Sequence, residues 1–170
     1  MTVRLETERL ILRKPNVGDV KAEAEFYASE RSQFVGGPLT EEMVWRMVAT
    51  IIGHWEMRGY GFFAIDLKST GAYVGRVGPW NPHGWPEPEI GWTLMQGHEG
   101  HGYAFEAAIA VRNWVYSELG WKTAISMIAP GNTRSIALAK KLGAVHDYDF
   151  THERYGDCGV WRHPAPGDCT

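Results

Sequence analysis

The sequence has few cysteines and no long apolar run. Cys158 and Cys169 are its only cysteines and form no Cys-x-x-Cys pair, so neither a dithiol redox motif nor a zinc ribbon is supported. No apolar stretch approaches the roughly 20 residues that a membrane-spanning helix needs. Residues 1–6 lack the apolar core of a signal peptide. We therefore expect a protein of the reducing cytoplasm with no membrane partner.

The sequence also lacks an excess of positive charge and two well-known phosphate motifs. It has 17 Lys and Arg residues against 20 Asp and Glu residues, a net charge of −3. Nucleic-acid-binding domains usually carry a basic face, so we expect no nucleic-acid partner. No Gly-Lys-Ser/Thr tripeptide of a P-loop occurs, and Phe105 stands where a dinucleotide fingerprint needs its third glycine. His98 and His101 are spaced like metal ligands but have no third ligand nearby, so we predict no metal site.

The composition and the residue patterns predict one α/β domain over residues 1–170, with 165–170 as a frayed tail. The 170 residues are 44% hydrophobic and 22% charged, as in ordinary globular domains. Alternating apolar residues, helical periods and Gly/Pro breaks predict the order β-α-α-β-β-β-α-β-α-β-β. The predicted strands are 5–13, 62–67, 73–77, 89–95, 121–128, 145–150 and 159–162. The predicted helices follow Asp19 and Thr40, run from Tyr103 to about Glu118, and run from Asn132 to Leu142.

A glycine-rich turn joins the predicted strand 89–95 to the helix that starts at Tyr103. Gly100 and Gly102 let the backbone approach a ligand closely and adopt positive φ. The free N–H groups of the first helical turn, together with the helix dipole, suit a pyrophosphate. On these residues alone, the glycines serve equally well to make a tight turn.

From Glu99 to Ala104 this turn resembles the pyrophosphate motif Gln/Arg-x-x-Gly-x-Gly/Ala of the GNAT superfamily N-acetyltransferases. Further blocks resemble the branch that contains the ribosomal-protein N-terminal acetyltransferases: residues 6–13, 89–92 with 106–108, and 132–136 with 141–143. The resemblance covers Leu5 to about Trp161. It implies a single GNAT-like α/β domain, with a central mixed, mostly antiparallel twisted sheet flanked by about four helices. Glu99 departs from the motif, and an acid near a pyrophosphate is unfavourable unless its side chain points away or is paired. Because the family binds the pyrophosphate mainly through backbone N–H groups, we expect reduced rather than lost cofactor affinity.

The resemblance implies that a primary amine, on a protein N-terminus or a small molecule, attacks the thioester of acetyl-CoA directly. Strands 89–95 and 121–128 would splay apart around the pantetheine arm. The implied contacts are backbone groups of Leu94 and Met95, with the Met95 N–H polarising the thioester carbonyl, and Asn132, which also caps its helix. The implied pyrophosphate site is the turn Gly100, His101, Gly102, Tyr103 and Ala104. A homodimer is the default assembly.

Two residues are the catalytic candidates, each with a plainer alternative. Glu89 is the predicted base, acting directly or through a water, because burial beside Trp85 and Trp92 would raise its pKa; the alternative is a structural carboxylate. The family's usual acid, a Tyr four residues before Gly143, is replaced by Ala139. Ser135 is therefore predicted to relay a proton, the alternative being a helix serine without a role.

Four further alternatives stay open. A CoA thiolate can leave without an acid, since thiols have a pKa of about 8.5. The missing Tyr and Glu99 support a second hypothesis, a non-catalytic acyl-CoA-binding or sensor domain. A toxin-like acetyltransferase acting on charged tRNA is disfavoured by the net charge of −3. The Trp-rich loop 80–85 either walls an acceptor pocket or folds onto the sheet as extra core.

Overall fold

The computed structural model describes residues 3–168, which form one eight-stranded sheet in the order β1-β2-β3-β4-β5-β6-β8-β7. All neighbouring strands are antiparallel except β5 and β6, which are parallel. The strands are β1 (Leu5–Glu6), β2 (Leu10–Arg13), β3 (Phe63–Leu67), β4 (Tyr73–Trp80), β5 (Glu89–Leu94), β6 (Ile125–Ile128), β7 (Val145–His152) and β8 (Gly156–Arg162).

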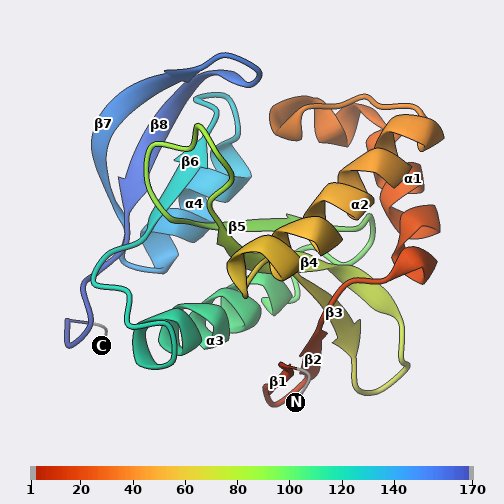
Figure 1. The fold of residues 1–170 in the computed structure, drawn as a ribbon, viewed down its shortest axis with the longest axis horizontal. Helices are drawn as coiled ribbons and strands as arrows, with labels where there is room; N and C mark the ends of the chain where they lie inside the picture. Colours follow the sequence, from red (N-terminus) through yellow and green to blue (C-terminus); the bar gives the residue numbers. More distant parts are fainter. Residues whose placement is uncertain (1–2, 169–170) are drawn as a thin grey trace.

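Four α-helices and two short 3-10 helices accompany the sheet in the described residues. The α-helices are α1 (Val20–Tyr27), α2 (Glu41–Arg58), α3 (Tyr103–Ser117) and α4 (Thr133–Lys141), and the 3-10 helices are η1 (Val17–Asp19) and η2 (Glu30–Val35). In Figure 1, β6, β7, β8 and α4 lie on one side of the view and α1 and α2 on the other, with β5 between them. The predicted fold class, a mixed and mostly antiparallel sheet with about four helices, is confirmed.

Two predicted boundaries are wrong for identifiable reasons. The predicted strand 5–13 is a tight hairpin of β1 and β2, because the Thr7 N–H donates to the Leu10 carbonyl at 3.0 Å and Thr7 Oγ1 accepts the Leu10 N–H at 3.0 Å. The predicted strand 121–128 is a strand only from Ile125, since the Trp121 N–H turns back to the Val115 carbonyl at 3.1 Å. Both differences arise from hydrogen bonds that no apolar pattern encodes.

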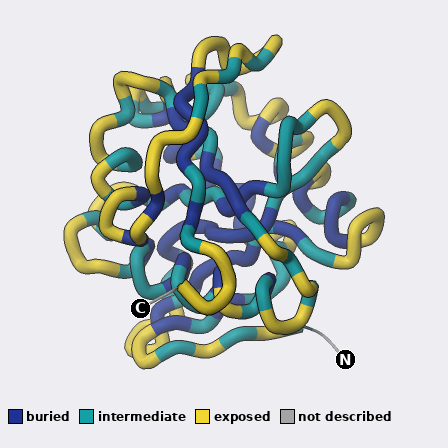
Figure 2. Tube along the Cα trace, turned by 90° about the vertical axis from the view of Figure 1, so that its left-hand side faces the viewer, coloured by how far each residue is buried: buried dark blue, intermediate teal, exposed yellow. Residues whose placement is uncertain are grey.

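Burial of apolar side chains holds the helices to the sheet. One cluster packs α3, through Ala107, Val111 and Val115, against strands β2 to β5. A second cluster packs α1 and α2 together with Met95. Figure 2 shows the buried residues concentrated along the central strands, with the exposed residues in the loops around them. The central strands are thus fixed by packing, and the loops at their ends are free to form a site.

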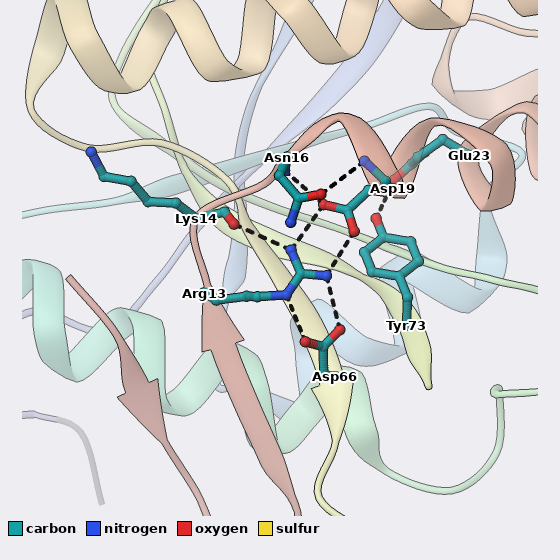
Figure 3. A network of polar contacts seen from close by, with 8 residues as sticks. Arg13, Lys14, Asn16, Asp19, Glu23, Asp66 and Tyr73 are labelled. Atoms are coloured by element: carbon teal, nitrogen blue, oxygen red, sulfur yellow. Dashed lines mark hydrogen bonds and ion pairs between the residues drawn. The ribbon is translucent and has the colours of Figure 1, made fainter. Parts of the chain in front are cut away.

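A partly buried polar network connects β2 to β3 and to the start of α1 (Figure 3). Arg13 on β2 donates to Asp66 on β3 from Nε at 2.6 Å and to Asp19 from Nη2 at 2.7 Å. Asp19 also accepts the Asn16 N–H at 2.9 Å. The Arg13 side chain is 27% exposed and that of Asp19 only 6%, so removal of the guanidinium leaves carboxylates without their cation in a largely dry place.

We therefore predict that Arg13→Gln lowers the free energy of unfolding by about 2–3 kcal/mol, measured by urea denaturation. Arg4→Gln is the control, because Arg4 pairs with Glu6 where both side chains are about half exposed, at 53% and 51%. Its loss should stay below about 1 kcal/mol. Equal losses in the two variants would show that the network contributes no more than a surface ion pair.

Candidate active site

Strands β5 and β6 form a fork. They pair at one register position, Glu89 with Ile125, and separate beyond it. Two side chains bridge the opening: Ser126 Oγ donates to the Ile90 carbonyl at 2.6 Å, and the Met127 N–H donates to Glu89 Oε1 at 2.9 Å. The splayed strands predicted from the family resemblance are therefore present in the structure, and side chains satisfy part of the backbone that the separation leaves unpaired.

Every second residue of β5 directs its backbone N–H and C=O groups toward the opening. The Met95 N–H donates to the Val74 carbonyl of β4 at 2.9 Å, so it points away from β6. The Ile90 carbonyl accepts from Ser126, and the Leu94 carbonyl accepts from Arg31 Nη2 at 3.4 Å, so these residues face the other edge. Every second residue of an antiparallel strand directs its backbone N–H and C=O to the same edge, so the backbone of Trp92, between Ile90 and Leu94, also faces the opening.

The predicted role of Met95 is therefore wrong. Its N–H is already bonded within the sheet, and its side chain is buried between the sheet and helices α1 and α2. The backbone groups of Leu94 and Trp92 take its place beside the opening.

Glu89 lies at the point where the fork opens, and its side chain is buried. Its Oε2 accepts the indole N–H of Trp85 at 2.6 Å, and its Oε1 accepts the Met127 N–H. Burial raises the pKa of Glu89 to about 7, although both hydrogen bonds act to lower it. Each oxygen accepts one N–H, so each keeps acceptor capacity for a further proton donor.

Two cavities meet at this fork. The first, which we call the aromatic cavity, has a volume of about 390 Å³ and is lined by Glu89 together with Trp80 and Trp85 of the predicted Trp-rich loop. The second, the glycine-turn cavity, has a volume of about 1090 Å³. The residues that line both are Phe34, Val35, Trp92, Thr93, Asn132 and Ser135. A ligand that fills the second cavity therefore reaches the first at the opening between the strands.

The predicted glycine turn lines the second cavity. Gly100 and Gly102 have φ of +79° and +81°, and Gly102 directly precedes the first residue of α3. Of the predicted cofactor contacts, Leu94, Gly100, Gly102, Tyr103, Ala104 and Asn132 line this cavity. His101 does not: its ring stacks on Tyr103 at a centroid distance of 5.4 Å, and its carbonyl accepts from Arg9 Nη1 at 2.9 Å.

Hydrogen bonds that were not predicted from the sequence hold this turn in place. Glu106 in the first turn of α3 accepts from Thr7 Oγ1 at 2.5 Å, from the Arg9 N–H at 2.9 Å and from Arg9 Nε at 2.7 Å. The Arg9 guanidinium also lies 4.8 Å from the centre of the Tyr103 ring. Two separate blocks of the sequence, 6–13 and 106–108, thus form one contact that fixes the start of α3. The only sequence signal for this contact is that both blocks resemble the same family.

At the other side of the opening, helix α4 contributes Asn132 and Ser135. Asn132 Oδ1 accepts the Ser135 N–H at 3.3 Å, which is the predicted helix cap. Ser135 Oγ accepts the indole N–H of Trp92 at 3.3 Å. The hydroxyl hydrogen of Ser135 is consequently not used in that bond.

Comparison with known proteins agrees with this geometry. Residues 9–145 match the acetyltransferase (GNAT) domain. The chain belongs to the GNAT acetyltransferase family. A solved acetyltransferase from Agrobacterium tumefaciens is 37% identical, with 96% of this chain and 95% of that chain covered and a TM-score of 0.88.

Other similar proteins share the fold or part of the sequence. The ribosomal-protein-S5-alanine acetyltransferase from Vibrio fischeri has a TM-score of 0.74 at 16% identity, with 99% of each chain covered, which shows the fold alone. The uncharacterised protein YkkB of Bacillus subtilis is 34% identical over 97 residues, 53% of this chain. That alignment spans 56% of YkkB.

The structure accounts for the two departures from the GNAT pattern. Glu99 forms ion pairs with Arg31 and, at 3.9 Å, with Arg134, and it accepts the Gly97 N–H at 2.8 Å. The charge of Glu99 is therefore paired, and a paired carboxylate repels a bound anion less than an unpaired one does. Ala139 is fully buried against Ile128. It lines neither cavity, so the replacement of the usual Tyr leaves no gap in the lining of either one.

Within residues 3–168, no group of three or more His, Cys, Asp or Glu side chains is placed to hold a metal ion. No helix in that same range is long and apolar enough to cross a membrane.

The raised pKa of Glu89 predicts a pH-dependent stability difference. Between pH 4.5, the ordinary value, and about 7 the folded state binds more protons at Glu89 than the unfolded state. Its contribution to the free energy of unfolding therefore falls as pH rises through this range. His163, whose pKa burial lowers to about 4, contributes the opposite slope. The contribution of His163 cancels in the difference between Glu89→Gln and the wild type, because both proteins contain this histidine.

We predict that the free energy of unfolding of Glu89→Gln minus that of the wild type increases by roughly 3 kcal/mol from pH 5 to pH 8, measured by denaturation at each pH. The offset at pH 5 is irrelevant, because only the slope reports the titration. Parallel curves across this range would mean that Glu89 titrates as an ordinary carboxyl.

Proposed function

We propose that this protein transfers an acetyl group from acetyl-CoA to a primary amine by direct attack, with Glu89 as the general base. The observation that carries the proposal is the position of Glu89: a buried carboxylate with a pKa near 7, where the fork opens into the aromatic cavity. A base works best when its pKa is close to the working pH. The position between the two cavities is where an amine and a thioester would meet.

The residues of the glycine-turn cavity suit acetyl-CoA. A Cβ added at Gly100 would meet no atom within 4 Å, and one at Gly102 would meet only Arg9 Nη2, at 3.5 Å. The chain therefore has glycines here because of their positive φ, and the space in front of them is open to a ligand. The free N–H groups in the first turn of a helix can donate to an anion, which supports a pyrophosphate site at the start of α3.

The opening of the fork suits the pantetheine arm. The backbone of Trp92 and Leu94 faces it, and we propose that one of these N–H groups, in place of that of Met95, polarises the thioester carbonyl. Asn132 lines both cavities and is proposed to bond the arm. Acetyl-CoA supplies the activated acetyl group, and the protein supplies alignment and proton transfer.

Two proton transfers complete the chemistry. The neutral amine attacks the thioester carbonyl carbon, and its nitrogen gives one proton to Glu89, directly or through a water, as the C–N bond forms and the C–S bond of CoA breaks. The departing thiolate takes one proton from Ser135 or from water. Ser135 can donate because its oxygen accepts the Trp92 indole N–H and its own hydrogen is not used in that bond. The amine loses one proton, the thiolate gains one, and the enzyme returns to its starting state after exchange with solvent.

We predict that Glu89→Gln lowers turnover by about 10²–10⁴-fold, the range for loss of a general base, in an assay of CoA release. Binding of acetyl-CoA, followed as a rise in melting temperature, should persist, because Glu89 does not line the glycine-turn cavity. Near-normal turnover in the folded variant would exclude Glu89 as the base.

A control for this variant is needed because both Glu89 oxygens accept N–H groups, so the Gln amide nitrogen would oppose either Trp85 or Met127. Trp85→Phe removes one of these donors. Alone it should move the acidic limb of the pH–rate profile to higher pH, since the hydrogen bond that it removes lowers the pKa of Glu89. Added to Glu89→Gln, it should restore stability but not turnover.

We further predict that Gly102→Val abolishes the rise in melting temperature with acetyl-CoA. Gly102 has φ +81°, which a β-branched residue rarely adopts, and the valine side chain would lie at the N-terminus of α3. Gly71→Val is the matched control: Gly71 has φ +72° and open space around it, but it lies in the β3–β4 turn and lines neither cavity. Both variants should lose similar stability, and only Gly102→Val should lose the ligand response. Normal acetyl-CoA affinity in folded Gly102→Val would contradict the assignment.

A further inference from the structure

The aromatic cavity is open at an apolar mouth. Phe34 of η2, Met43 of α2 and Tyr155 in the β7–β8 turn all line the cavity and are nevertheless exposed, at 39%, 45% and 37%. Large apolar side chains gathered at one opening mark a surface that receives an apolar partner. Further inside, Phe62, Trp80 and Trp85 continue the apolar lining as far as Glu89.

The charges around the cavity favour an acceptor with one amine. Glu89 is the one acidic side chain that lines it in the described part of the chain. Three arginines line it as well: Arg76 pairs with the buried Glu23, and Arg46 pairs with Glu42 at 2.6 Å. Arg154 forms no ion pair within residues 3–168, and its guanidinium lies 5.5 Å from the centre of the Tyr155 ring. A second ammonium group would meet this cation without a carboxylate to balance it.

The mouth is also poorly suited to a polypeptide. Tyr155 Cε1 lies 2.9 Å from where a Cβ of Gly36 would stand, so the tip of the β7–β8 hairpin packs directly on the end of η2. Figure 1 shows the hairpin tip and η2 approaching each other above the sheet. A peptide leaving the cavity past Phe34, Met43 and Tyr155 would place its amide groups against apolar side chains, which is unfavourable.

We propose, on the basis of the function proposed above, that the acceptor is a small monoamine carried on an aromatic or bulky apolar body, of the arylalkylamine class. The amine lies at Glu89, and the ring lies against the apolar wall formed by Phe62, Trp80 and Trp85. The cavity of about 390 Å³ is within the range of pockets that enclose small ligands. Polyamines and protein N-termini are the acceptors that the charges and the mouth disfavour.

The test compares acceptors at saturating acetyl-CoA by CoA release from the full chain. The acceptors are 2-phenylethylamine, tryptamine, ethanolamine, spermidine and a hexapeptide with a free N-terminal Ala. The two arylalkylamines should exceed ethanolamine in kcat/KM by more than about tenfold, since each buried methylene-sized group contributes roughly a factor of four and an aromatic ring adds several such groups. Spermidine and the hexapeptide should fall below both arylalkylamines.

The outcomes separate this inference from the proposed function. Faster turnover of ethanolamine, spermidine or the hexapeptide would overturn the acceptor class and leave the acetyltransferase intact. Absence of CoA release with every acceptor, in protein that still binds acetyl-CoA, would overturn the proposed function and the acceptor class with it.

A pair of variants on α2 locates the acceptor. Met43→Gln makes the mouth polar at nearly constant volume and should lower kcat/KM for 2-phenylethylamine about threefold to tenfold, through KM, with ethanolamine unchanged. Met57→Gln is the matched control, because Met57 is 87% exposed on the same helix and does not line the cavity. Equal effects of the two variants, or none from Met43→Gln, would show that the acceptor does not use this mouth.

Discussion

Strands β5 and β6 pair at a single register position and then separate, and the rest of the site depends on how that separation is stabilised. Separating strands leave N–H and C=O groups without ladder partners, which is unfavourable away from water. Here the Glu89 carboxylate accepts the Met127 N–H, and the Ser126 hydroxyl donates to the Ile90 carbonyl. The backbone of Trp92 and Leu94 is left facing the opening, where a ligand can complete the pairing.

One carboxylate therefore has a structural and a chemical part in this account. To reach the Met127 N–H, Glu89 must be buried, and that burial raises its pKa to about 7. The two alternatives that the sequence left open for Glu89, base and structural carboxylate, are compatible in this arrangement. The hydrogen bond from Trp85 orients the second oxygen and links the carboxylate to the wall of the aromatic cavity.

The two ends of the site are stabilised differently. The fork is held from within the sheet, whereas the glycine turn is held from outside it, by Thr7 and Arg9 bonding to Glu106. Because Glu106 is in the first turn of α3, this contact sets where the first N–H groups of that helix point. The N-terminal hairpin, which lies at the far edge of the sheet from β6, thereby contributes to the position of the proposed pyrophosphate site.

Sequence reasoning succeeded where the chemistry is local. Thr40 and Asn132 were predicted as helix caps, and their side chains accept the N–H groups of Met43 and Ser135, both at 3.3 Å. It failed where a property depends on a partner far along the chain. Which edge of β5 the Met95 N–H faces is decided by pairing with β4, and no feature of residues 89–95 encodes that.

The prediction for His101 failed for the same reason. Its ring stacks on Tyr103 and its carbonyl accepts from Arg9, about ninety residues away, so it does not line the glycine-turn cavity. The family resemblance supplied Glu89 and the turn, but not the contacts with Trp85 and Met127 that give Glu89 its properties.

The central claim is that the Glu89 carboxyl titrates near neutral pH at the fork. The most direct measurement is a ¹³C NMR titration of protein labelled at the glutamate carboxyl carbon, with the Glu89 signal assigned as the one missing from Glu89→Gln. The account predicts a single carboxyl signal that shifts with a midpoint near pH 7, as burial requires. A Glu89 signal that has finished titrating by about pH 5.5, about one unit above the ordinary range, would contradict it.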